Sequence, residues 1–434
     1  MRAVDLPLPR LLWTAGGFYI AASLVLCITQ TPLGSTLFFS LAAVMAAAYG
    51  LVLARIWNDV AGAPRLLRSA FIIALLIRVP LAVAPVGSDN DMVRYLWDGR
   101  VQHAGYNPYA VLPADPAMAH THTAETAAMP SARQRTPYPP AAQLFFRLVT
   151  TLWDSTLGMK LALLACDLLT IVVLWRWLMV TERNPWLALA YAWNPLVVLE
   201  VAHSGHIDAL GALWITASAY WLARRHTALA SIAFVLAVAA KLLPIVLAPL
   251  FLGRVRVRDI LTGGALLLLL YLPFTTAESG LLAAGAVPNV VEYIRFNGPV
   301  FRSLALAFTP SAAAAVALLL GLAAAVYARA RLSANDPAAW GWPMTLSLLC
   351  APVIYPWYLL YATPFLFTRA TLPITAWSIS IIPVYIVWRV SREGGRWRVP
   401  ASTLVLEYGV FVIACIAVAI WVRRRAAVRD PLSL

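Results

Sequence analysis

Residues 66–91 read LLRSAFIIALLIRVPLAVAPVGSDND, an apolar run that ends directly in two carboxylates. A helix rises about 1.5 Å per residue, so roughly 20 apolar residues cross the ~30 Å hydrocarbon core of a bilayer. Asp89 and Asp91 open a polar segment, residues 85–138, in a chain that is otherwise almost all apolar. Because charge is costly next to hydrocarbon, ionisable groups at this boundary are candidates for a functional site.

Apolar runs of the same kind recur along the whole chain. Of its 434 residues, 62% are hydrophobic and 12% are charged, whereas soluble domains carry about 25% charged residues. The sequence therefore predicts an all-α polytopic integral membrane protein, a single domain over residues 1–434 with about 12–14 transmembrane helices. We expect spans near residues 11–28, 37–56, 66–84, 155–180, 186–202, 207–223, 227–252, 259–274, 303–328, 340–355, 357–369, 371–388 and 403–422.

The basic residues indicate which turns face the cytoplasm. The net charge of +14 comes from 33 Lys and Arg against 19 Asp and Glu. These basic residues fall in short clusters between apolar runs, which is the positive-inside pattern of a membrane protein and does not indicate a nucleic-acid partner. The count places a first long loop, residues 85–138, and a second loop, residues 275–301, on the outer face.

Two segments are hard to reconcile with this assignment of turns to the two faces of the membrane. A single crossing over residues 227–252 would place the arginines that follow it outside, so we expect a hairpin of two short helices bent near Lys241 and Pro244. Broken helices are tolerated at membrane depth where they line a cavity. Later in the chain four arginines fall on the outer side, which means either that one crossing is miscounted or that they bind lipid headgroups. They are Arg389, Arg392, Arg396 and Arg398.

Residues 91–104 favour an amphipathic helix that lies in the membrane interface. One face carries polar side chains at spacings of three and four, and we expect it to look into the protein or the water. That face consists of Asp91, Arg94, Tyr95, Asp98 and Gln102. Ser88-x-x-Asp91 also matches a capping box. A carboxylate at a helix start stays ionised and accessible, so it would equally suit a general base.

Further polar residues lie between later spans. The cluster Glu200, His203, His206 and Asp208 fits no standard zinc spacing. Three interpretations of this cluster stay open. In order of preference, it lines a polar cavity, forms an ordinary helix hairpin or binds a metal. Lys241 lies in an apolar run, where it either snorkels to the interface or binds an anion.

The second loop and a late turn add more candidates. Arg295 suits phosphate because its fork donates two parallel hydrogen bonds, although it could equally anchor outer headgroups. Asn297 lies two residues further on, and Tyr355 begins the turn Tyr355-Pro356-Trp357-Tyr358. Trp and Tyr at an interface usually belong to an aromatic belt, which is our expectation for Trp357 and Tyr358.

The motif Asp91-x-x-Arg94-Tyr95-x-Trp97-Asp98-Gly99-Arg100-Val101 resembles the first external loop of prokaryotic GT-C glycosyltransferases, and more closely the polyprenyl-phosphate-mannose-dependent mannosyltransferases. The likeness continues through Tyr138-Pro139-Pro140, Gly205-His206-x-Asp208, Lys241-x-x-Pro244 and Pro356-Trp357-Tyr358. The resemblance implies a GT-C-like membrane domain with an external catalytic loop. It also implies an inverting transferase in the bacterial inner membrane, with its active site on the extracytoplasmic face.

The same resemblance implies the substrates and the roles. A sugar, expected to be mannose, would move from a polyprenyl-phosphate donor to a hydroxyl of a glycan or lipid acceptor. The catalytic base would be Asp91, with Asp89 as the alternative. We expect the donor phosphate or sugar to contact Arg94, His206, Lys241 and Arg295. The cavity lining would be Tyr95, Asp98, Tyr138, Glu200, His203, Asp208, Asn297 and Tyr355.

No metal or other cofactor is expected, because a lipid phosphate is already a good leaving group. Two other functions stay open: a flippase or transporter of lipid-linked sugars, and an O-antigen ligase or polymerase that uses a diphosphate donor. Transporters carry their polar sites at mid-membrane. Here the candidate residues gather at one face, which favours an enzyme.

Overall fold

The computed structural model describes residues 7–57, 63–86, 91–127, 129, 131–280 and 284–429. This part of the chain is helical and contains no β-strand, apart from an isolated bridge between Phe296 and Val353. The predicted all-α class is confirmed. Asp89 and Ser88 lie outside the described residues.

Eight helices in the described ranges are long and apolar enough to cross a membrane, or nine if the bent pair Pro185–Ala192 and Pro195–His203 is one span. The chain is therefore a multi-pass membrane protein. These eight or nine spans are fewer than the 12–14 expected, because several of the expected crossings are short or broken helices. The eight are α1 (Leu8–Ile28), α2 (Thr36–Trp57), α3 (Pro64–Val83), α6 (Thr156–Val180), α11 with η5 (Val257–Tyr271, Leu272–Phe274), α14 (Pro310–Arg331), the run η8–α16–η9–α17 (Arg369–Thr371, Leu372–Ser380, Ile382–Tyr385, Ile386–Arg392) and α18 (Ala401–Arg429).

Shorter helices complete the bundle between these spans. They are η2 (Pro185–Ala188), α7 (Leu189–Ala192), α8 (Pro195–Val197), η3 (Val198–His203), α9 (Asp208–Ala223), α10 (Thr227–Ala240), η4 (Leu243–Phe251), α15 (Pro337–Leu349), η6 (Pro356–Tyr361) and η7 (Thr363–Phe365). Many of them start at a proline, because a proline at the first helical turn loses no hydrogen bond, whereas inside a helix it would break one. The result is a bundle with several breaks in its helices.

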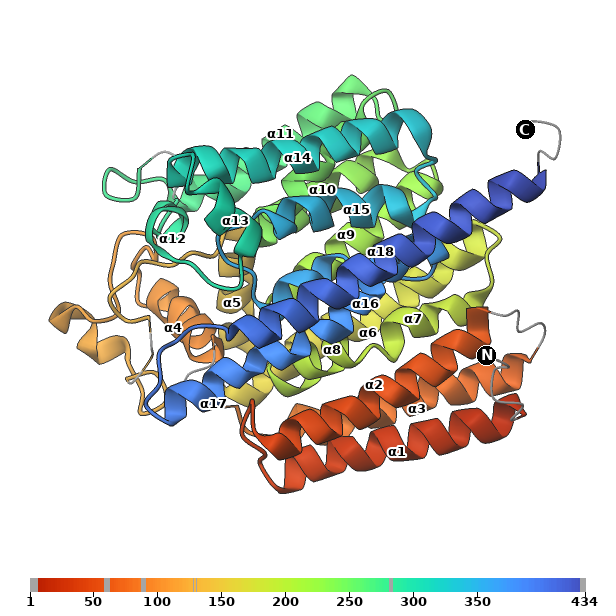
Figure 1. Ribbon diagram of the computed structural model, residues 1–434. Coiled ribbons are helices and arrows are strands. Elements are labelled where there is room, and N and C mark those ends of the chain that lie inside the picture. Colours follow the sequence, from red (N-terminus) through yellow and green to blue (C-terminus); the bar gives the residue numbers. More distant parts are fainter. Residues whose placement is uncertain are drawn as a thin grey trace.

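The two ends of the bundle differ (Figure 1). One end, on the left of the figure, carries the short helices α4 (Met92–His103), η1 (Pro116–Thr121), α5 (Pro140–Leu152), α12 (Val287–Tyr293) and α13 (Pro299–Leu304). We call it the loop end. At the opposite end α1 begins and α18 finishes.

The segment 227–252 returns to the end at which it starts. Lys241 has an extended backbone that ends α10, and η4 then runs back. The Thr227 hydroxyl donates to Asp259 at 2.6 Å, and Arg254 donates to the Leu332 carbonyl at 2.8 Å. The expected hairpin is confirmed, and the arginines that follow it lie at the opposite end.

The late arginines do lie at the loop end. Arg392, the last residue of α17, donates to the Leu33 carbonyl in the turn between α1 and α2. The Trp397 ring lies 6.1 Å from the ring of Phe296 in the second loop. The charge count therefore places these arginines at the same end of the bundle as the structure does.

Helix α4 is buried by protein on both faces. Its polar face contacts the end of the first loop, as described below. We expected the other face to meet the membrane interface. Instead, Val93, Trp97 and Val101 pack against Met118 and Met129 of the same loop. The loop thus folds over its own first helix.

Candidate active site

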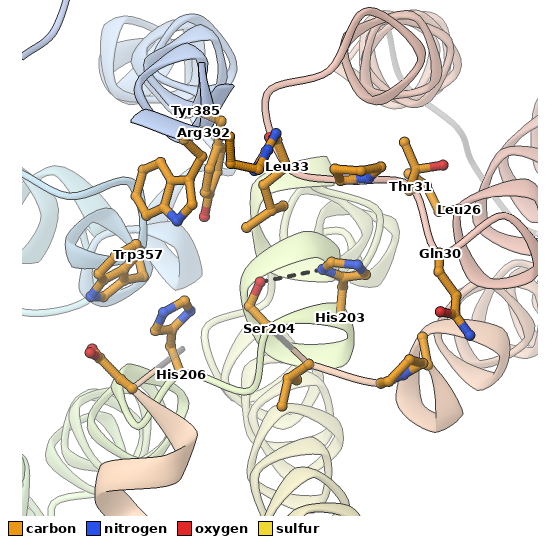
Figure 2. Close-up of a pocket in the computed structure, with 16 residues that line it drawn as sticks. Leu26, Gln30, Thr31, Leu33, His203, Ser204, His206, Trp357, Tyr385 and Arg392 are labelled. Carbon is orange, nitrogen blue, oxygen red and sulfur yellow. Dashed lines mark hydrogen bonds between the residues drawn. The ribbon is translucent and has the colours of Figure 1, made fainter. Parts of the chain in front are cut away.

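A cavity of about 250 Å³ opens at the loop end (Figure 2). It lies where the start of α4, the end of η3, the turn between α1 and α2, and helix α17 come together. Its lining consists of Leu26, Gln30, Thr31, Pro32, Leu33, Ala84, Pro85, Val86, Asp91, His203, Ser204, His206, Trp357, Tyr385, Trp388 and Arg392. The described lining residues therefore combine one carboxylate, two imidazoles and one guanidinium with apolar and aromatic walls.

Asp91 lies at the N-cap position of α4. Its backbone carbonyl accepts from the amides of Arg94 at 2.9 Å and Tyr95 at 3.1 Å. Its side chain makes no capping hydrogen bond to the helix. The carboxylate is half-buried and lines the cavity. It is thus accessible to a ligand, as a general base must be.

Glu200 organises the residues behind the cavity. Asn194 caps the helix that begins at Pro195, where the span bends by 50°, and residues Val198–His203 form a π-helix. Such an insertion often occurs at functional sites. The Glu200 carboxylate accepts a 2.6 Å hydrogen bond from the Tyr385 hydroxyl and lies 3.0 Å from Nδ1 of His206.

This contact sets the charge of His206, which lies in the turn after the π-helix. Burial alone would lower the pKa of His206. The hydrogen bond and the charge of Glu200, together with the charges of Asp91 and Asp208, outweigh burial and raise that pKa above its ordinary value. His206 therefore keeps its proton to a higher pH than a free imidazole does.

A column of stacked rings supports the His206 imidazole. It stacks on Trp357 at 4.0 Å, Trp357 stacks on Tyr355 at 4.5 Å, and Tyr355 stacks on Phe296 at 4.4 Å. The bridge between Phe296 and Val353 holds this column to the second loop. The aromatic-belt interpretation of Trp357 is wrong, because its ring is only 7% exposed and packs inside the protein.

Family membership can be judged against this geometry. The family model for the MptA_B family, alpha-(1->6)-mannopyranosyltransferase, N-terminal domain, matches residues 14–258, more than half of the chain. The chain belongs to this mannosyltransferase family. It is a glycosyltransferase, and the matched range includes Asp91, Glu200 and His206. No curated protein and no solved structure matches the chain.

Lys241 and Asp208, two residues that the sequence predicted for the site, form an ion pair beside the cavity. The Lys241 ammonium lies 2.6 Å from Asp208 and 3.7 Å from the centre of the Tyr358 ring. Neither Lys241 nor Asp208 belongs to the cavity lining. Lys241 does not snorkel towards headgroups. Its ion pair joins the break in the 227–252 hairpin to the first residue of α9.

Arg94 and Asp98 turn towards the first loop. Arg94 donates to Asp98 at 2.7 Å and to the Gln134 carbonyl at 2.8 Å. Asp98 also accepts from Thr136 at 2.6 Å and from Gln143 at 2.8 Å. These contacts fasten the end of the first loop to α4. The structure therefore does not bring Arg94 or Asp98 to the cavity.

Arg295 and Asn297 also lie outside the cavity lining. Arg295 donates to the Val291, Glu292 and Ile294 carbonyls, which closes the end of α12. Asn297 donates to the Ile354 carbonyl at 3.3 Å and to Glu407 at 3.1 Å. Both hold the second loop in place.

Tyr95 and Tyr138 lie close to Asp91 but, like Tyr355, do not belong to the cavity lining, contrary to our expectation. Their ring centres are 5.1 Å apart, and the Tyr95 hydroxyl accepts from the Ile207 amide at 3.3 Å. Burial raises the pKa of both phenols, and the charge of Asp91 adds to that effect. Both therefore stay neutral and serve as hydrogen-bonding groups.

The sequence did not predict several residues that line the cavity. They are Arg392, Tyr385, Trp388 and the turn Gln30–Leu33. The one signal for Arg392 was its place on the outer side of the charge count. His203, in contrast, was expected and does line the cavity, with Nδ1 3.4 Å from Ser204. Over the described ranges, no group of three or more His, Cys, Asp or Glu could hold a metal ion.

Proposed function

We propose that the enzyme transfers mannose, with inversion, from a polyprenyl-phosphate donor to an acceptor hydroxyl, and that Asp91 is the general base. Family membership supports the sugar and the reaction class. One observation supports the mechanism above all. Asp91 presents a carboxylate to a cavity at the loop end, and its side chain is not used to cap α4.

The proposed step is a single displacement. Asp91 takes the proton of the acceptor hydroxyl as that oxygen attacks the anomeric carbon of the donor sugar. The bond from this carbon to the phosphate oxygen breaks, and its electrons remain on the released polyprenyl phosphate. Attack from the face opposite the leaving phosphate inverts the anomeric configuration. The cationic His206 stabilises the negative charge that develops on the phosphate.

The charge distribution supports a loop end on the extracytoplasmic side of the bacterial inner membrane. The turns at the opposite end carry basic residues, and short basic turns normally stay in the cytoplasm. Three of those turns lie together: Arg183 donates to the Asn335 carbonyl, and Arg254 donates to the Leu332 carbonyl. Nucleotide sugars stay in the cytoplasm, so a site on the other side would need a sugar carried by a lipid.

The test is a transfer assay with the purified protein in nanodiscs. Polyprenyl-monophosphate mannose, the glucose analogue and a diphosphate-linked sugar are offered with glycan and lipid acceptors, and products are read by mass spectrometry. We expect transfer from the monophosphate mannose alone, with an inverted linkage by NMR. Transfer from the diphosphate donor only would indicate a ligase or polymerase. Donor crossing liposomes without product would indicate a flippase.

A further inference from the structure

One wall of the cavity is apolar and continues towards the lipid-facing surface. Leu26 and Leu33 lie on one side of this wall, and Pro85 and Val86 lie on the other. Ile28, two residues after Leu26, is 77% exposed, and Val83, just before the lining residues Ala84–Val86, is 64% exposed. Such large exposed apolar residues at the ends of membrane helices face lipid. The apolar wall therefore borders lipid-facing side chains at the ends of α1 and α3.

Arg392 lies next to Leu33 of this apolar wall. Figure 2 shows it beside Leu33 and Tyr385, on the far side of the cavity from His206. Among the described lining residues it is the only Lys or Arg. Its bond to the Leu33 carbonyl uses one of the five N–H donors of a guanidinium. That bond orients the fork and leaves donors for a ligand.

The turn between α1 and α2 is pressed against the start of α17. Gly34 has a φ of +76°, and a Cβ there would lie 2.1 Å from the carbonyl oxygen of Tyr385. Only glycine allows this approach. The turn 29–35 and the last turns of α17 therefore form one unit, which holds Arg392 and the apolar wall in a fixed relation.

Charge decides where a phosphate can bind in this cavity. The Asp91 carboxylate repels a phosphate, so the phosphate must lie away from the start of α4. Arg392 lies on the opposite wall, and its planar fork matches two phosphate oxygens. A phosphate held there would lie between Arg392 and His206, with the attached sugar extending towards Asp91.

We infer that Arg392 and the turn 29–35 form the binding site for a polyprenyl monophosphate. The guanidinium binds the phosphate, and the first isoprene units lie along Leu26, Leu33 and Val86. This inference rests on the proposed function for the sugar, but the phosphate and the chain are recognised without it. Arg392 is thus assigned a role in donor affinity.

The test compares Arg392→Ala and Arg392→Lys with a matched control, Arg389→Ala. Arg389 lies one turn earlier on α17, where its guanidinium pairs with Glu393 at 2.8 Å and lies outside the cavity lining. We expect Arg392→Ala to raise the donor KM at least tenfold with an unchanged acceptor KM. Arg392→Lys should recover part of the loss, and Arg389→Ala should stay within twofold of the wild type.

A binding measurement separates this inference from the proposed function. Polyprenyl monophosphate without sugar is added to the protein in detergent, and the rise in melting temperature is followed. We expect half-maximal stabilisation of Arg392→Ala to need at least ten times more lipid, and inorganic phosphate to give no stabilisation. If the wild type transfers no mannose but shows this difference, the proposed function fails and the inference stands. Stabilisation by inorganic phosphate at matched concentration would mean a free-phosphate site and overturn it.

Equal donor KM and equal lipid binding in Arg392→Ala and the wild type would also overturn the inference. Should Arg392→Ala fail to fold, Leu33→Trp provides a second variant, because the indole would fill the apolar wall and leave the guanidinium in place. We expect Leu33→Trp to weaken binding of the lipid monophosphate by a similar factor. Unchanged lipid binding in that variant would contradict the proposed position of the isoprene chain.

Discussion

Glu200→Gln removes the charge that holds the proton on His206. In the wild type the Glu200 carboxylate lies 3.0 Å from Nδ1 of His206 and accepts a 2.6 Å hydrogen bond from Tyr385. The amide keeps the size of the side chain but cannot attract the imidazolium. Only the charges of Asp91 and Asp208 then oppose the effect of burial, so the pKa of His206 falls. The variant should therefore lose the proton on His206 at a lower pH than the wild type does.

The size of the effect follows from one hydrogen bond to a charged group. Such a bond contributes about 1.5–3 kcal/mol, which corresponds to roughly 10- to 150-fold in rate. If His206 stabilises the departing phosphate, kcat at neutral pH should fall by this factor.

The pKa of His206 is raised in the folded protein, so its contribution to folding stability depends on pH. That contribution is complete below the unfolded-state pKa of about 6.5 and is lost as pH rises through the folded-state value.

The assay is the pH profile of kcat, with Tyr385→Phe as the control. That control removes the other hydrogen bond to Glu200 and leaves the contact between Glu200 and His206. In Glu200→Gln we expect the alkaline limb of the profile to move to lower pH, because His206 deprotonates earlier. In Tyr385→Phe the limb should not move to lower pH. Superimposable profiles for Glu200→Gln and the wild type would refute the role of His206.

Three further predictions concern packing around the site. Gly205→Ala should lower the melting temperature and kcat, because φ is +70° and the new Cβ would lie 2.2 Å from the Met92 side chain at the start of α4, at a cost of about 1–2 kcal/mol for the backbone alone. Gly105→Ala has a φ of +84° but open space around it, so an equal loss of kcat there would contradict this prediction. Arg94→Met should speed proteolysis of the first loop and leave the donor KM unchanged; a raised donor KM would return Arg94 to the site. Trp357→Ala should cost about 3–5 kcal/mol in chemical denaturation, whereas Trp357→Phe should retain most of the stability; equal losses in the two variants would contradict the stacking argument.

Much of the fold could be predicted because the apolar runs and the basic residues of a membrane protein are easy to recognise in its sequence. The length of apolar runs predicts helices, and the arginines after residue 252 correctly predict the hairpin at 227–252. Both depend on local composition and on the cost of charge in hydrocarbon. The packing of the apolar face of α4 under the first loop could not be predicted, because an interface and a protein core favour the same residues.

The site was harder to predict because a cation in a sequence shows neither its partner nor its direction. Arg94 finds Asp98 one turn away on its own helix, and Lys241 finds Asp208 from another span. In the sequence alone, both Arg94 and Lys241 look like cations free to bind a phosphate. The structure shows that each is paired with a carboxylate. Arg392 joins the cavity through a turn 359 residues earlier in the chain, a proximity that no local pattern indicates.

The most direct test of the central claim is the rate of mannose transfer by Asp91→Asn, with Asp154→Asn as the control. Asp154 is an exposed carboxylate at the loop end that pairs with Arg100 at 2.9 Å, and it lies outside the cavity lining. General-base catalysis contributes about 10²–10⁴-fold, so we predict a loss of kcat in that range for Asp91→Asn, with the donor KM within twofold and Asp154→Asn unchanged. A wild-type kcat in Asp91→Asn would contradict the account. So would a larger loss of kcat in Asp89→Asn than in Asp91→Asn.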